Sequence, residues 1–176
     1  MKRLISFLAL VTLAAGAAGC GSDTPTAPSS SASTSTTYTA VLLPASEVPP
    51  ISGSEASGSG TATLKFNLTK DSAGNTTAAT LDVTVSVTGF PPGTALTASH
   101  IHPGGVGVNG GILVSLGLVP GEVSFATGSG SFTRQGVTMT VDQANSILAN
   151  PAGFYLNIHT AANAGGVARG QLTRTQ

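Results

Sequence analysis

Three histidines are the residues in this sequence best suited to chemistry. His100 and His102 flank Ile101, and His159 lies in the run 154–160. Side chains alternate between the two faces of an extended strand, so His100 and His102 share one face and Ile101 occupies the other. In the run 154–160, Phe154, Leu156 and Ile158 form an apolar face, and His159 belongs to the opposite set. If the apolar residues point into a core, all three imidazoles stand on the outer surface of one sheet or barrel.

Such a set can hold a metal ion. A His-x-His pair on one strand can present two imidazoles to Zn²⁺ or Cu²⁺, and a third imidazole from another strand completes a three-ligand site. In that case, ligand nitrogens within about 4 Å of one another are expected, given metal–nitrogen bonds of about 2 Å. The alternative is that no metal is bound. The histidines then hydrogen-bond to the backbone of glycine-rich covering loops, and Asn157 joins them.

Arg169 follows a glycine-rich stretch at 163–168. It either steers an anion or, as a structural residue, donates hydrogen bonds to carbonyl groups where the last strand begins. The sequence has no Gly-x-Ser-x-Gly turn, no His-Glu-x-x-His helix and no phosphate-binding glycine loop, so no residue is assigned a catalytic role. We therefore expect a protein that is not an enzyme.

After position 38, apolar and polar residues alternate with a period of two almost to the end of the chain. The runs 62–68 and 81–87 alternate apolar and polar residues, and the turn residues at 70–75 predict that they pair as a hairpin. Glycine and proline separate the remaining runs. Many short strands between turns favour an all-β, antiparallel sandwich or barrel. The shorter strands are expected at 38–43, 98–102, 111–116, 128–133, 154–160 and 168–174.

One segment departs from this period. Over residues 140–149 the apolar positions have helical spacing, and Thr140 with Gln143 forms a possible capping box. Pro151 ends the run. We expect one short helix here, closing one end of the barrel and serving packing alone.

The amino terminus has the features of a secretory signal. Residues 1–19 combine a basic start, an apolar run and small residues at the end. Cys20 is the only cysteine, so it forms no internal disulfide, and its position favours lipidation. Cleavage by signal peptidase I instead of II remains an alternative. A diacylated Cys20 would anchor the chain in the cell envelope, and the absence of Asp after it favours the outer membrane.

Composition divides the rest into two parts. Residues 20–37 are almost entirely Ser, Thr, Ala, Pro and Gly, which predicts a disordered tether behind the lipidated cysteine. Residues 38–176 are long enough for one domain with one core. The formal net charge of the chain is zero, so nucleic acid is not an expected partner. The expected partners are the membrane, through the lipid, and an unidentified protein or surface.

Four stretches together resemble the CHRD domain, a module named after chordin and found in many secreted bacterial proteins. They lie at 38–50, 58–64, 98–102 and 155–172, and the last is the most specific. This chain has Ala164 and Val167 where a typical member has Pro and Glu. The resemblance implies an immunoglobulin-like β-barrel distantly related to copper–zinc superoxide dismutases. Those enzymes use more histidines, an Asp between their metals and a disulfide, so redox catalysis is not expected here.

These features lead to two functional hypotheses. The first is a lipid-anchored, extracytoplasmic CHRD module with a binding or structural role and no cofactor. The second is a periplasmic or extracellular metal-binding protein that holds Zn or Cu through His100, His102 and His159.

Overall fold

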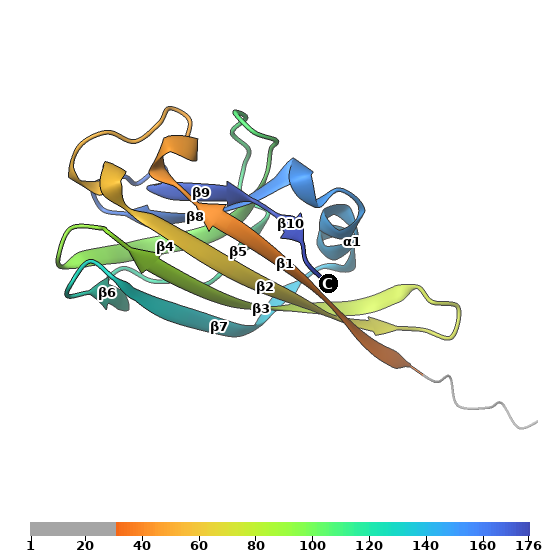
Figure 1. Cartoon of the computed structure of the whole chain (residues 1–176). Coiled ribbons are helices and arrows are strands. Elements are labelled where there is room, and N and C mark those ends of the chain that lie inside the picture. The colour runs from red at the N-terminus through yellow and green to blue at the C-terminus, as the bar shows by residue number, and fades with distance from the viewer. Residues whose placement is uncertain (1–30) are drawn as a thin grey trace, which may run out of the picture.

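Two antiparallel β-sheets form the molecule (Figure 1). The structure, a computed structural model, describes residues 31–176. The first sheet has the order β10 (Thr173–Arg174), β1 (Ala32–Leu42), β2 (Ser59–Lys70), β3 (Thr76–Thr88) and β7 (Gly130–Met139). The second has the order β5 (Val114–Ser115), β4 (Thr94–Pro103), β8 (Phe154–Thr160) and β9 (Ala168–Gln171), and β6 (Val123–Phe125) also pairs with β4. The all-β antiparallel sandwich expected from the sequence is confirmed.

The predicted hairpin is present as β2 and β3. Their register runs from Ser59 opposite Thr88 to Lys70 opposite Thr76. In the turn, the Asp71 carboxylate accepts hydrogen bonds of 2.9 Å from the backbone N–H groups of Ala73 and Asn75. Asp is favoured at such a position because its side chain can satisfy backbone donors two to four residues ahead.

Strand β1 begins earlier than the sequence pattern indicated. Ala32 pairs with Lys70, so residues 32–37 belong to a strand and the expected tether does not extend to residue 37. This segment is rich in Ser and Thr, and its side chains lie largely in solvent, so no apolar alternation marks it. Residues 32–37 are instead held in a strand by backbone pairing with the long hairpin strand β2. The predicted signal, residues 1–19, and Cys20 lie outside the described residues.

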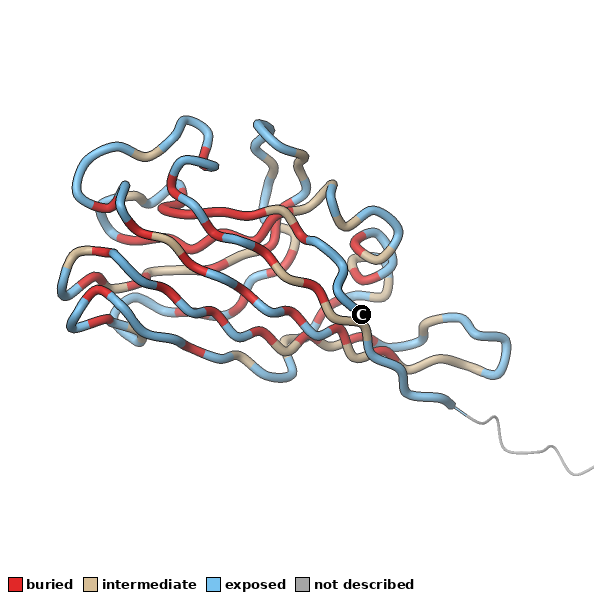
Figure 2. The backbone as a smooth tube through the Cα atoms, viewed as in Figure 1, coloured by how far each residue is buried: buried red, intermediate tan, exposed pale blue. Residues whose placement is uncertain are grey.

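Alternation along the strands builds the core. Burial changes from residue to residue along β2 and β3, as Figure 2 shows by the alternating colours of the tube. Leu64, Phe66 and Leu81 are fully buried between the sheets. From the second sheet, Ile101 and Ile158 are equally buried and point into the same core. The opposite face of β4 and β8 is therefore left for polar side chains.

The two sheets are joined along one side. The N–H of Leu43 donates to the Arg169 carbonyl at 3.1 Å, and the N–H of Arg169 donates to the Leu43 carbonyl at 3.3 Å. Gly170 follows at this seam, where a Cβ atom would come 2.1 Å from the Val41 carbonyl oxygen. The sandwich is thus continuous where β1 meets β9.

One α-helix, α1 (Val141–Ala149), occurs in the described part of the chain, as predicted. Thr140 caps it through the expected box: its hydroxyl accepts from the Gln143 N–H, and the Gln143 side chain accepts from the Thr140 N–H. Ala144 and Ile147 are buried against the core, whereas short 3₁₀ turns occupy 44–46, 54–57 and 151–153. No helix within residues 31–176 is both long and apolar enough to span a membrane.

Candidate metal centre

Strands β4 and β8 place the three histidines together. In their antiparallel register Ala98 lies opposite His159, and His100 lies opposite Asn157. Because Ile101 and Ile158 point into the core, the three imidazoles stand on the outer face of the second sheet. This outer face is not open to solvent. His102 and His159 are only 7% and 6% exposed, because loops cover this part of the sheet.

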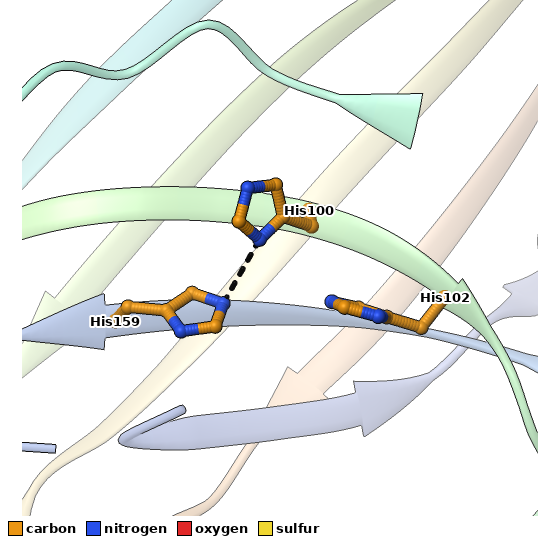
Figure 3. A group of neighbouring side chains, drawn as sticks. All are labelled: His100, His102 and His159. Carbon is orange, nitrogen blue, oxygen red and sulfur yellow. Dashed lines mark hydrogen bonds between the residues drawn. The ribbon is translucent and has the colours of Figure 1, made fainter. Parts of the chain in front are cut away.

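The three rings converge on one point (Figure 3). Nδ1 of His100 lies 3.0 Å from Nε2 of His159. One nitrogen from each of His100, His102 and His159 can be chosen so that all three atoms lie within 4.8 Å of one another. One pair therefore meets the expected separation of about 4 Å, and the set as a whole is slightly wider.

Backbone carbonyls fix the tautomers of two of the rings. Nδ1 of His102 lies 3.0 Å from the Gly110 carbonyl oxygen, and Nδ1 of His159 lies 2.9 Å from the Ala164 carbonyl oxygen. A carbonyl oxygen only accepts hydrogen bonds, so both Nδ1 atoms carry the proton. In the neutral rings both Nε2 atoms then keep a free lone pair. Carbonyl partners of this kind hold the rings of metal-binding histidines in place.

Nε2 of His102 has no hydrogen-bond partner although it is buried. A buried acceptor without a partner costs about 1–3 kcal/mol. Nε2 of His159 lies 2.9 Å from Oδ1 of Asn157. An amide oxygen cannot donate to a lone pair, so this contact is favourable only if the amide turns its nitrogen toward the ring or if Nε2 is protonated. Nε2 of His159 can instead accept a hydrogen bond from Nδ1 of His100 at 3.0 Å, so Nε2 of His102 is the one ring nitrogen of the three histidines that is buried without a partner.

The spacing suits a metal ion after a small adjustment. Bonds of about 2.1 Å hold two nitrogen ligands at most about 4.2 Å apart. The widest separation here, 4.8 Å, must therefore close by at least about 0.6 Å, and by about 1.4 Å to reach the separation of about 3.4 Å found in tetrahedral zinc sites. The donor set consists of three imidazole nitrogens, which suits zinc and copper.

The surroundings lower the pKa of two of the histidines, His100 and His159. Burial, with the nearby charges of His159 and His102, lowers the pKa of His100 from 6.5 to about 4. Burial also lowers the pKa of His159, against the opposing effect of its hydrogen bond to Ala164. Metal ions bind the deprotonated ring, so a lowered pKa leaves the lone pairs available at neutral pH.

A stack of side chains supports His102 from behind. The ring of Tyr155 lies parallel to that of His102, with centroids 5.0 Å apart and an interplanar angle of 9°. The guanidinium carbon of Arg169 lies 4.3 Å from the centroid of the same tyrosine ring. Arg169 also donates from Nη1 to Oδ1 of Asn109 at 2.9 Å and to the Val108 carbonyl at 3.3 Å. It therefore fastens the loop that covers His102 to the sheet.

Sequence reasoning missed two buried carboxylates near this centre. Glu47 is 6% exposed, and burial raises its pKa to about 7 despite the positive charge of Arg169. Glu55 is 8% exposed and accepts hydrogen bonds from the Thr160 hydroxyl and the Asn163 amide. Both lie at least 45 residues before His100 along the chain, in irregular segments. No local pattern indicates that they fold over β8.

A comparison with family models identifies the domain. The model described as the CHRD domain matches residues 38–172. The chain belongs to the CHRD family. The match covers β2, β4, β8 and β9, and thus every residue of the three-histidine cluster. CHRD membership is compatible with a binding or structural module.

Two further comparisons found no relative. No curated protein and no solved structure matches this chain. The distant relation to copper–zinc superoxide dismutases therefore stays a prediction from the sequence.

Proposed function

We propose that this CHRD domain is a non-enzymatic module that binds one copper or zinc ion through His100, His102 and His159. The observation that carries the proposal is the buried Nε2 of His102, which has no partner and faces two other imidazoles. A bound cation would accept this lone pair. It would also take the lone pair of Nε2 of His159, which lies beside Nδ1 of His100 and the side-chain amide of Asn157.

The ligand set favours copper over zinc. For nitrogen donors, the affinity of divalent metals rises along the first transition row to Cu²⁺ and falls again at Zn²⁺. Three imidazoles from two adjacent strands leave the remaining coordination positions to solvent or to another molecule. No carboxylate joins the cluster in the part of the chain that the structure describes. Membership of the CHRD family and this simple donor set support binding rather than catalysis.

Equilibrium dialysis tests this function. The tag-free chain carrying Cys20→Ser, so that no thiol competes, is dialysed against Cu²⁺ or Zn²⁺ and its metal content is measured. We expect about one ion per chain, at least tenfold weaker binding in His102→Gln, and unchanged binding in Asp142→Asn, which alters an exposed carboxylate elsewhere. Metal well below one ion per chain, or equal binding by the His102→Gln chain, would contradict the proposal.

We further propose that a lipid on Cys20 holds the module at the envelope membrane, outside the cytoplasm. The sequence of residues 1–20 supports this, because an apolar run with small residues at its end precedes the only cysteine. Two acyl chains make membrane attachment stable, where one does not. Metabolic labelling with an alkyne analogue of palmitate should mark the wild-type protein and not Cys20→Ser. A label that persists in the variant rules out attachment at this residue.

A further inference from the structure

Arg169 is a buried cation without an anion. Its side chain is 1% exposed, and no carboxylate of residues 31–176 comes within 4.0 Å of its nitrogens. Arginine cannot shed its proton in a protein, so its charge persists wherever it is buried. Nη1 has the two acceptors described above, but Nη2 has no partner at all. The tyrosine ring beneath it compensates only part of the charge.

The nearest acid does not supply the missing negative charge. Glu47 affects Arg169 electrostatically but forms no ion pair with it, and its own Oε1 is buried without a partner. The burial that raises the pKa of Glu47 to about 7 keeps much of this carboxyl neutral at neutral pH. The structure thus holds a free donor on Arg169 and an unused oxygen on Glu47 beside the same cleft.

That cleft has about 430 Å³ of space and aliphatic walls. Its lining includes the charged pair Arg169 and Glu47 and three valines, Val41, Val48 and Val106. The three valines are unusually open for their type: Val106 is 86% exposed and Val41 is 61% exposed. Pockets for small molecules have this size, and they typically combine apolar walls with a few polar groups.

We propose that this cleft is a binding site for a small aliphatic carboxylate. The carboxylate accepts a charge-assisted hydrogen bond from Nη2 of Arg169, and the protonated carboxyl of Glu47 donates to its second oxygen. The aliphatic part lies against Val41, Val48 and Val106. Both Nη2 of Arg169 and Oε1 of Glu47 are shielded from bulk water, so the loop that carries Val106 has to move for a ligand to reach them. Gly105 and Gly107 flank this residue and give the backbone the freedom to move.

This site is separate from the three-histidine cluster, and its test uses metal-free protein. Sodium hexanoate is titrated into the isotope-labelled full chain, and the NMR signals of Val106, Gly107 and the Arg169 side chain are followed. We expect saturable shifts with hexanoate and much weaker binding of hexanamide, which has the same length and no charge. Affinity should rise about fourfold for each methylene added from butyrate to hexanoate. Equal binding of hexanamide and hexanoate would overturn the proposal.

Two pairs of variants separate binding from folding. Arg169→Gln removes the cation and should abolish saturable binding, whereas Arg169→Lys should retain part of it. Since Arg169 is buried and its replacement can unfold the domain, the second pair alters exposed residues only. Val106→Asp places a negative charge on the wall and should weaken hexanoate binding about tenfold. Val119→Asp alters another exposed valine, which is 58% exposed and lies outside the cleft, and this variant should bind as wild type does. Equal affinities of these two aspartate variants would refute the site.

Discussion

Replacing Glu47 with Gln should make the stability of the metal-free domain depend on pH. His100 has a pKa of about 4 in the folded protein, below its ordinary value of 6.5. Its contribution to the free energy of unfolding is therefore complete above pH 6.5 and is lost as the pH falls toward 4. Glu47 has a folded pKa of about 7, above its ordinary value of 4.5. Its contribution is complete below pH 4.5 and is lost as the pH rises through 7. In the wild type the two trends oppose each other.

The size of the effect follows from the two pKa values. At about 1.4 kcal/mol for each pKa unit, either group accounts for at most about 3 kcal/mol. His100 is partly open to solvent, which reduces its share to about 1–2 kcal/mol. His159 has a lowered pKa as well and acts in the same direction as His100. The substitution removes only the Glu47 titration, so between neutral pH and about pH 4.5 Glu47→Gln should lose up to about 3 kcal/mol more than the wild type.

Urea unfolding followed by circular dichroism measures this difference. The free energy of unfolding is determined at pH values of about 7, 5.5 and 4.5 for the wild type, Glu47→Gln and the exposed-site control Asp142→Asn. The slope against pH, not the absolute stability, is compared, so a uniform cost of the substitution does not matter. If Glu47→Gln shows the same slope as the wild type, or gains stability in acid, the opposing titration of Glu47 and the histidines is wrong.

Two further predictions concern the residues that support the centre and the fold. Glu55→Gln should lower metal affinity about tenfold. Glu55 accepts hydrogen bonds from Thr160 and Asn163 and so fixes the loop whose Ala164 carbonyl orients His159. A competition titration measures the affinity, and an unchanged value would count against this chain of contacts. Thr140→Ala should destabilise the domain by about 1 kcal/mol through loss of the capping box, measured by urea unfolding. An unaltered free energy of unfolding would show that α1 does not depend on its cap.

The sequence predicted those features that depend on local periodicity. The alternation in β2, β3 and β8 identified the strands, and the same alternation assigned Ile101 and Ile158 to the core and the histidines to the other face. The helix α1 was predictable because its start signal, Thr140 with Gln143, is contained within four residues. These features need no knowledge of the rest of the chain.

Features set by long-range contacts were not predictable in the same way. The three-residue strand β6 is too short to show a period, and residues 32–37 become a strand only because β2 offers a long partner. The sequence suggested glycine-rich loops over the histidines as one alternative, but it did not show which long-range contacts hold this cover in place. The cover depends on contacts such as that of Asn109 with the Val48 carbonyl, which are 61 residues apart. A nearly neutral Glu47 beside Arg169 arises only once those segments have folded together.

Electron paramagnetic resonance of the copper-loaded chain is the most direct test of the metal centre. The account predicts about one Cu²⁺ per chain with hyperfine splitting from three imidazole nitrogens, and one nitrogen fewer in His102→Gln. A spectrum without nitrogen splitting, or one that is the same in His102→Gln, would contradict coordination by His100, His102 and His159.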